Sequence, residues 1–260
     1  MASILFYKYH GAGNDFIVID DRLGGFDTSD EAMVRRLCDR RYGVGADGLM
    51  LLQEHPGYDF RMVYYNADGR QGSMCGNGGR CMVAFAQRLG LIADKAAFLA
   101  ADGEHYATIN PAGNWVSLKM IDVDHVARDG EAYVLHTGSP HYVQLVEGLP
   151  QFPVAEHGAA IRNSDTYHAE GINVNFVERE GGGYFVRTYE RGVEDETFAC
   201  GTGATAAALA MAMHYGFEGD LQMPIRVRGG QLTISFRREG NAFTKIYLEG
   251  PASFVFAGAI

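Results

Sequence analysis

The motif Met74-Cys-Gly-Asn-Gly-Gly-Arg-Cys81 recurs as Ala199-Cys-Gly-Thr-Gly-Ala-Thr-Ala206, an offset of 125 residues from Cys75 to Cys200. Each copy runs into an apolar, helix-forming stretch, residues 82–89 in the first and 207–215 in the second. Upstream, His10-Gly-Ala-Gly-Asn-Asp-Phe16 resembles His136-Thr-Gly-Ser-Pro-His-Tyr142 at an offset of 126. Matches in the same order at nearly one offset predict two homologous halves related by a pseudo-two-fold axis.

Short strand-like runs occupy most of each half, and helices are few. Thr28-Ser-Asp-Glu31 is a capping-box signature that predicts a helix start, and the helix after Cys200 is apolar nearly all round, which predicts full burial. We expect an α/β fold of the α+β type with two pseudo-symmetric domains, each a mostly antiparallel sheet wrapped round a central helix. The predicted halves are 1–123 and 124–251, with the last strand, about 252–260, returning to the first half. The predicted strands include 16–20, 60–66, 106–109, 115–120, 172–178, 184–191, 231–236 and 245–249.

The composition indicates a globular protein with an ordinary hydrophobic core and excludes several classes of function. Of 260 residues, 47% are hydrophobic, and the formal net charge is −10. That acidic balance, without a Lys/Arg-rich run, argues against a nucleic-acid partner. No apolar run is long enough to span a membrane, and the N-terminus does not resemble a signal peptide. With only four cysteines, we expect reduced thiols and a cytoplasmic location.

The chemistry of each motif follows from a cysteine placed just before a helix. Unsatisfied backbone N–H groups and the positive end of the helix dipole favour thiolate over thiol, and the same groups can hold a carboxylate. Inversion of a carbon centre by proton transfer needs a base on one face and an acid on the other. We therefore predict that Cys75 and Cys200 form a thiolate/thiol pair acting on one carbon, without a cofactor.

Other interpretations of the cysteines and glycines fit less well. Cys38 and Cys81 are expected to pack in the core, because isolated buried cysteines usually do so. A zinc site would require closely spaced Cys and His ligands, so no metal is predicted. Gly201 to Ala206 satisfies a loose dinucleotide pattern, but the preceding residues 191–197 do not form the apolar strand that such a site requires.

Nearly the whole chain resembles the diaminopimelate epimerase family. The paired cysteine motifs are fairly specific, and together with the polar motifs around them they are highly specific. The segments that carry the resemblance are Gly11-Ala-Gly-Asn14-Asp-Phe16, Gly43-Val-Gly-Ala-Asp-Gly48, Tyr65-Asn66-Ala-Asp-Gly69, Met74-Cys75-Gly-Asn77-Gly-Gly-Arg80, Gly138-Ser-Pro-His141, Gly171-Ile-Asn173-Val-Asn-Phe176, Glu190-Arg191-Gly192 and Ala199-Cys200-Gly-Thr202-Gly203.

The resemblance implies interconversion of L,L- and meso-2,6-diaminopimelate, on the route to lysine and cell-wall peptide. It implies two domains that close over the substrate, with a cysteine at the start of each central helix. His141 and Glu190 would line the reacting centre. The implied substrate-binding residues, chiefly for the distal amino-acid end and the reacting carboxylate, are Asn14, Asn66, Gly76, Asn77, Asn173, Glu190, Arg191, Gly201 and Thr202.

Two positions depart from the family, and two alternatives stay open. Ser139 stands where many relatives have asparagine, and Gly48 where some have glutamine. A proline or hydroxyproline racemase also uses two cysteines, but typically has histidine where this chain has Asn77. A phenazine-type isomerase, which uses a carboxylate, fits poorly. The other alternative is a non-catalytic amino-acid-binding relative. The sequence leaves a homodimer open.

Overall fold

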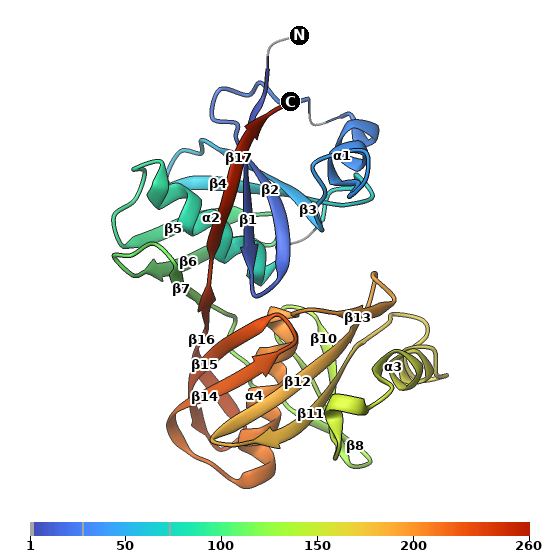
Figure 1. Cartoon of the computed structure of the whole chain (residues 1–260). Helices are drawn as coiled ribbons and strands as arrows, with labels where there is room; N and C mark the ends of the chain where they lie inside the picture. The colour runs from blue at the N-terminus through green and yellow to red at the C-terminus, as the bar shows by residue number, and fades with distance from the viewer. Residues whose placement is uncertain (1–2, 28, 73) are drawn as a thin grey trace. The chain divides into compact units, whose positions relative to one another are not determined.

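The computed structural model describes residues 3–27, 29–72 and 74–260 (Figure 1). The chain divides into two compact units, Met1–Leu118 together with Gly250–Ile260, and Lys119–Glu249. Each unit has its own central helix and its own sheet. Within the described residues, no helix is long and apolar enough to cross a membrane.

The first unit wraps a mostly antiparallel sheet round the helix α2 (Figure 1). Most neighbouring strands are antiparallel, whereas β2 with β3 and β4 with β5 are parallel. The strand β17 pairs antiparallel with β1. The elements are β1 (Leu5–Gly11), β2 (Asn14–Asp20), α1 (Glu31–Cys38), β3 (Gly48–Gln53), β4 (Phe60–Asn66), α2 (Gly76–Arg88), β5 (Lys95–Ala100), β6 (Gly103–Ile109), β7 (Trp115–Lys119) and β17 (Ser253–Ala259).

The second unit repeats this design round the helix α4. Here β10 with β11 and β12 with β14 are the parallel pairs, and the other pairings are mostly antiparallel. The elements are β8 (Ala127–Asp129), β9 (Ala132–His136), β10 (Pro140–Leu145), the 3-10 turn η1 (Leu149–Gln151), α3 (Val154–Arg162), β11 (Asn173–Glu180), β12 (Gly183–Glu190), β13 (Asp195–Thr197), α4 (Gly201–Tyr215), β14 (Gly219–Val227), β15 (Gly230–Glu239) and β16 (Ala242–Pro251).

The internal repeat predicted from the cysteine motifs holds for the elements and their pairing. The sequence of antiparallel, parallel and antiparallel pairings in β1 to β4 is the same as in β9 to β12. The helices α1 and α3 follow the second strand of each set, and α2 and α4 follow the fourth. The predicted fold class is therefore confirmed, including a mostly antiparallel sheet and a central helix in each unit.

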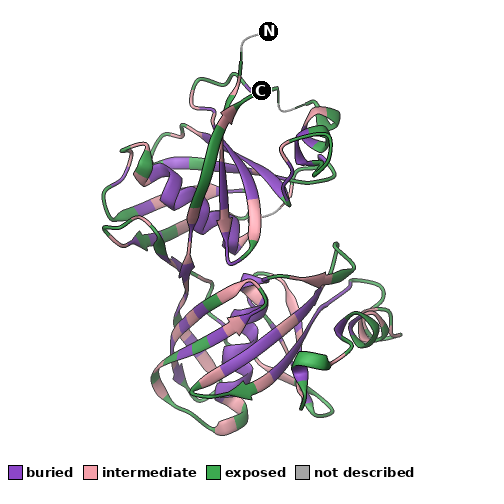
Figure 2. Ribbon diagram, viewed as in Figure 1, coloured by how far each residue is buried: buried purple, intermediate pink, exposed green. Residues whose placement is uncertain are grey.

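Both central helices are buried for most of their length (Figure 2). In α4 the small side chains of Ala206, Ala207, Ala208, Ala210 and Ala212 let the surrounding strands approach the helix closely. Gly216, with φ of 69°, ends α4 in the left-handed conformation that glycine adopts without strain. These apolar helices are the centres of the two cores, as the sequence predicted.

The start of α1 differs from the predicted capping box. Thr28, the first residue of that box, lies outside the described residues. The helix begins at Glu31 with Asp30 as its N-cap, and the Asp30 carboxylate accepts a hydrogen bond of 2.8 Å from the Met33 backbone N–H. Aspartate serves this position because its short side chain reaches an N–H group that the helix leaves unpaired. Leu37 and Val34 then face the core of the first unit.

Candidate active site

Cys75 and Cys200 occupy the same position in the two units, since each is the N-cap of the central helix. Their backbones are extended, with φ and ψ of −109° and 122° at Cys75 and −114° and 112° at Cys200. Cys75 is half-buried, and Cys200 is 7% exposed. Each cysteine is therefore placed at the positive end of a helix, where backbone N–H groups favour thiolate.

The second glycine of each motif is required by packing at the helix start. A Cβ on Gly203 would lie 2.3 Å from Asn175 Oδ1 and 3.3 Å from Cys200 Sγ, and one on Gly78 would lie 2.9 Å from Met50 Sδ. Both glycines lie within the helix, and neither has a positive φ. These glycines therefore let the helix N-terminus pack closely against its neighbours.

Around Cys75, amide side chains connect the helix start to β2. Cys75 Sγ lies 3.6 Å from Asn14 Oδ1, and Asn77 Nδ2 donates to the same oxygen at 3.2 Å. The Asn14 amide is oriented by Asp47, whose carboxylate accepts from Asn14 Nδ2 at 2.6 Å. Arg80 Nη2 then donates to Asn77 Oδ1 at 3.0 Å. The structure thus brings Cys75, Asn14 and Asn77 together.

Asn66 is less closely tied to this group. It ends β4, its side chain is exposed, and its backbone belongs to a turn in which Gly69 N–H donates to Asn66 O. Gly48 is its direct partner in β3. A Cβ on Gly48 would lie 2.5 Å from Tyr64 Cε2 and 2.6 Å from Tyr65 O, so a glutamine would not fit without movement. The packing of Tyr64 therefore accounts for this departure from the family.

Around Cys200, a chain of hydrogen bonds leads from the sulfur to a buried imidazole. Cys200 Sγ lies 3.5 Å from Thr202 Oγ1, which is 3.2 Å from Ser139 Oγ. Ser139 Oγ is in turn 3.0 Å from His141 Nε2. Asn175 Nδ2 meets the other ring nitrogen, Nδ1 of His141, at 3.1 Å. His141 is thus coupled to Cys200 through two hydroxyl groups.

The polar neighbours of His141 determine which atoms donate and which accept in this series of hydrogen bonds. Asn175 Nδ2 also contacts the carbonyl oxygen of Tyr142, which can only accept a hydrogen bond. This atom of Asn175 is therefore the amide NH2 group, and it donates to His141 Nδ1 as well. The proton of a neutral imidazole is then on Nε2, which donates to Ser139 Oγ. Burial lowers the pKa of His141 to about 3, so the ring is neutral at physiological pH.

The buried neutral state of His141 makes unfolding depend on pH. The unfolded chain binds a proton at His141 below a pH of about 6.5, whereas the native ring stays neutral down to about pH 3. The stabilisation is therefore complete above about pH 6.5 and falls by about 1.4 kcal/mol per pH unit as the pH drops. We expect His141→Gln to flatten this dependence, measured by urea unfolding between about pH 4 and 7.

The matched control is the exposed His125, and His125→Gln is expected to leave the slope unchanged. An unaltered slope in His141→Gln would contradict the burial of a neutral His141.

The predicted recognition residues of the second unit lie at the ends of β11 and β12. Asn173 Oδ1 accepts from the Arg191 backbone N–H at 2.9 Å, and its Nδ2 donates to Ser139 Oγ at 3.1 Å. Glu190 accepts from Thr197 Oγ1 at 2.9 Å. The Arg191 side chain is exposed, and Nη1 donates to Glu170 O at 2.9 Å. Asn173 therefore joins Arg191 to the hydroxyl chain of Cys200.

Three polar residues of these two groups were not predicted as site residues. Ser139 contacts His141, Thr202 and Asn173, and Asn175 orients His141. Arg80 lies fully buried behind Asn77. A sequence signal existed for each, because all three are polar residues within the quoted motifs. Only the three-dimensional contacts show that they form a supporting layer.

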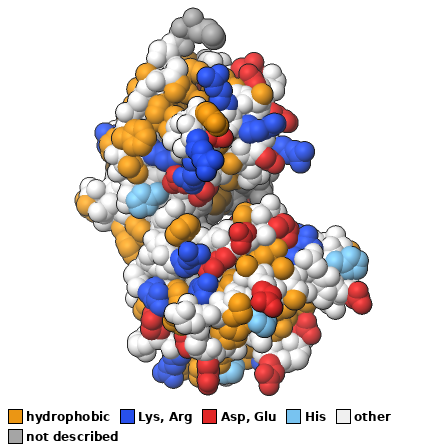
Figure 3. Space-filling view, turned by 45° about the vertical axis from the view of Figure 1, so that its right-hand side comes forward, with side chains coloured by type: hydrophobic (Ala, Val, Ile, Leu, Met, Phe, Trp, Pro, Cys, Tyr) orange, Lys and Arg blue, Asp and Glu red, His pale blue; other side chains and the backbone are white. Residues whose placement is uncertain are grey.

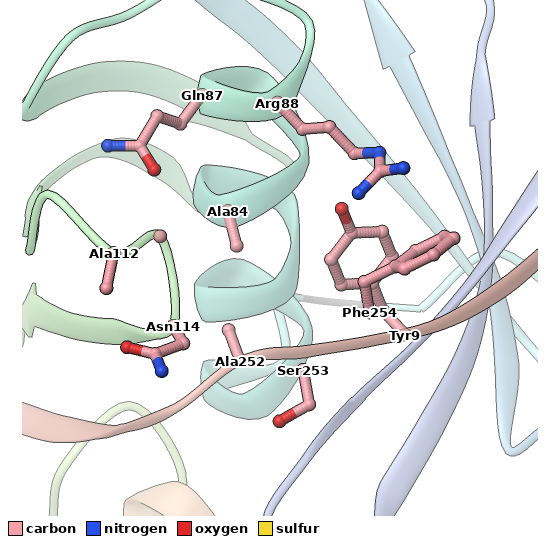
Figure 4. A pocket seen from close by; sticks show the side chains of 10 residues that line it. Tyr9, Ala84, Gln87, Arg88, Ala112, Asn114, Ala252, Ser253 and Phe254 are labelled. Atoms are coloured by element: carbon pink, nitrogen blue, oxygen red, sulfur yellow. The ribbon is translucent and has the colours of Figure 1, made fainter.

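Cys38 and Cys81 pack in the core, as expected. Both are buried, and burial raises the pKa of each thiol to about 12. Among the described residues, no group of three His, Cys, Asp or Glu side chains is arranged to hold a metal ion. A pocket of about 410 Å³ beside α2 and β17 contains none of the predicted site residues; Figure 4 shows Tyr9, Arg88 and Phe254 on one side of it.

The sequence and the fold of this chain are similar to those of known proteins. A family model described as diaminopimelate epimerase matches residues 6–126 and 133–255. The diaminopimelate epimerase of Flavobacterium psychrophilum is 52% identical over 255 residues, which cover 98% of this chain and 99% of that protein. That of Chlorobaculum tepidum is 43% identical, covering 96% and 98%. A PhzF-family phenazine biosynthesis protein of Bacillus anthracis shares the fold, with a TM-score of 0.77 at 13% identity over 100% and 99% of the two chains.

Proposed function

The chain belongs to the diaminopimelate epimerase family, and on that premise we propose that it interconverts L,L- and meso-2,6-diaminopimelate through Cys75 and Cys200. It is accordingly an isomerase. The observation that carries the mechanism is the matched placement of the two cysteines, each as the N-cap of a buried central helix. No other pair of thiols in the described residues has this placement, because Cys38 and Cys81 are core residues.

The proposed step moves one proton off the α-carbon and another onto it. A cysteine thiolate takes the α-proton, and the electron pair of the broken C–H bond stays on the carbon, delocalised into the adjacent carboxylate. The thiol of the other cysteine gives its proton to the opposite face, which inverts the centre and leaves the two protonation states exchanged. General acid–base catalysis of this kind contributes about 10²–10⁴-fold to the rate.

The reacting carboxylate would be held by the two helix starts. Backbone N–H groups at Gly76 and Asn77, and at Gly201 and Thr202, lie in the first turns of α2 and α4. Such groups are unpaired within the helix and carry partial positive charge. They would stabilise the charge that develops on the carboxylate when the proton leaves.

The distal end of the substrate carries an ammonium group and a carboxylate, and the remaining residues suit these charges. Arg191 offers a guanidinium for the carboxylate, and Glu190 offers a carboxylate for the ammonium. Asn173 is fixed between Arg191 and Ser139, and Asn14 and Asn66 complete the proposed set. His141 would line the reacting centre as a neutral ring, acting through Ser139 and Thr202.

The cellular setting follows from the chemistry and the charge. We place the protein in the cytoplasm, in the formation of lysine and cell-wall peptide, without a nucleic-acid partner. The net charge of −10 supports the last point. On the face shown in Figure 3, the Lys and Arg side chains are interspersed with Asp and Glu.

Exchange of the α-proton into deuterated solvent tests the substrate. With L,L-diaminopimelate we expect exchange together with formation of the meso form, followed by NMR and chiral chromatography, because the distal charges match Glu190 and Arg191. With L-proline, which has no distal amino-acid end, we expect none.

Exchange with proline alone would identify the racemase alternative. Binding of diaminopimelate without exchange would identify a non-catalytic relative.

A further inference from the structure

Arg80 is a fully buried cation within the first two turns of α2. Its Nη2 donates to Asn77 Oδ1 at 3.0 Å, while Nη1 and Nε lie 3.4 Å from Gly76 O and Pro251 O. Among the ion pairs of the described residues, none includes Arg80. Burial lowers the pKa of Arg80 to about 10, so the group remains charged at neutral pH.

The location of this charge is unfavourable for the helix itself. The side chain reaches back to Asn77 and Gly76, because Cβ bonds in a helix point toward its N-terminus. A cation at this end opposes the helix dipole, and a buried ion without a counter-ion is costly. Gly11 also makes room for it, since a Cβ there would lie 3.3 Å from Arg80 Nη2. An anion at the same helix start would offset both costs, and Cys75 is the N-cap of this helix.

The charges of the cluster next to Asn14 cancel one another. Behind Asn14, two cations and two anions form one cluster: Lys8 and Arg40 pair with Asp15, and Arg40 also pairs with Asp47. Asn14 Oδ1 faces the sulfur as a neutral dipole. Cys81 follows Arg80 in the helix as a neutral thiol, with its pKa raised to about 12. Arg80 therefore adds a buried positive charge to the helix start that carries Cys75.

Cys200 has a different environment at the equivalent position. Thr205 stands where the first motif has Arg80; it is fully buried, and its hydroxyl donates to Gly201 O at 3.0 Å. The groups that lead away from Cys200 are the hydroxyls of Thr202 and Ser139 and a neutral His141. The nearest charged residues of the proposed site in this unit, Glu190 and Arg191, are neighbours in the sequence and carry opposite charges. The two helix starts are thus alike in backbone and unlike in charge.

We propose that Arg80 is a positioning residue that makes Cys75 the resting thiolate and leaves Cys200 the resting thiol. This assignment rests on the proposed function, in which the two cysteines form one acid–base pair. It follows that the free protein is held mainly in the form that accepts the stereoisomer whose α-proton faces Cys75. The other stereoisomer reacts only after a proton has moved from Cys200 to Cys75, so that Cys200 is the thiolate and Cys75 the thiol.

Thiol titration without substrate tests the assignment. In Cys200→Ala and Cys75→Ala variants, the ultraviolet absorbance of thiolate is followed from about pH 5 to 10, where Cys38 and Cys81 stay protonated. We expect Cys75 to ionise about one pH unit or more below Cys200, a roughly tenfold or greater difference in acidity. Ionisation of Cys200 before Cys75 would overturn the proposal.

Variants of Arg80 test the cause. In the Cys200→Ala background, Arg80→Met should raise the Cys75 midpoint by about one pH unit, and Arg80→Lys, which keeps the charge, by less. In the Cys75→Ala background, Arg80→Met and the matched Thr205→Val should leave the Cys200 midpoint in place. Equal shifts of both cysteines would show that Arg80 is only structural.

If circular dichroism shows that Arg80→Met is unfolded, the comparison of the two cysteines with Arg80 intact still decides the assignment. Because no substrate is present, this outcome is independent of whether diaminopimelate is the substrate.

Discussion

Cys75→Ser and Cys200→Ser should each lower the epimerisation of diaminopimelate by about 10²–10⁴-fold or more, because each removes one member of the acid–base pair. A serine hydroxyl is a far weaker acid than a thiol, so it does not supply the anion that takes the α-proton. The measurement is the rate of conversion of L,L- to meso-diaminopimelate and of the reverse reaction. Cys38→Ser is the matched control, with epimerisation retained, because Cys38 packs in the hydrophobic core of the first unit.

The two variants should differ in what they retain. Each loses the base for one stereoisomer and keeps the thiolate that deprotonates the other. Exchange of the α-proton with deuterated solvent should therefore survive for one stereoisomer only, and that stereoisomer should swap between the variants. If one variant loses exchange with both stereoisomers and the other loses it with neither, a single thiol serves both faces and the paired mechanism is wrong.

Arg191→Ala should raise KM for diaminopimelate with a smaller effect on kcat, because its guanidinium is proposed to bind the distal carboxylate. Loss of one partner of a charge-assisted contact costs about 2–5 kcal/mol, which corresponds to a roughly 30-fold or greater rise in KM. The Arg191 backbone N–H that donates to Asn173 survives the substitution, so the frame of the site is retained. Steady-state kinetics with L,L-diaminopimelate provide the measurement.

Arg179→Ala is the matched control, since Arg179 is an exposed cation near the end of β11 opposite to Asn173, and its guanidinium lies over the Tyr215 ring. Unchanged kinetics in Arg191→Ala would show that the substrate is oriented differently.

The fold could be predicted from the sequence wherever a local pattern and the repeat agreed. The run after Cys200 is apolar on all sides, so its burial as α4 required no knowledge of its neighbours. Strands such as β4 and β12 are rich in aromatic and β-branched residues, which favour strands. The helix α3 was missed, because Val154–Arg162 contains Gly158 and begins after Pro153 without a capping side chain. Tyr189 explains that glycine, since a Cβ there would lie 2.3 Å from Tyr189 Cβ.

The site was predictable to the extent that its residues lie in the motifs. The positions of Cys75 and Cys200 follow from the spacing of glycine and the apolar run, and the structure places both as N-caps. The role of Ser139 was not accessible, because two of its three partners, Thr202 and Asn173, come from other segments of the chain. Arg80 was equally hidden, since neither its full burial nor the absence of an ion pair among the described residues can be read from a motif.

The pairing of β17 with β1 has a consequence for the order in which the protein is made. The second unit is one continuous segment, Lys119–Glu249, so all of its strands are present before residues 253–259 are synthesised. The first unit needs those last residues to cover the edge of β1. Although domains generally fold in order from the N-terminus during synthesis, here the half translated first is the last to be completed. Until then the ribosome-bound chain carries an open strand edge at Leu5–Gly11, where pairing with other chains begins most readily.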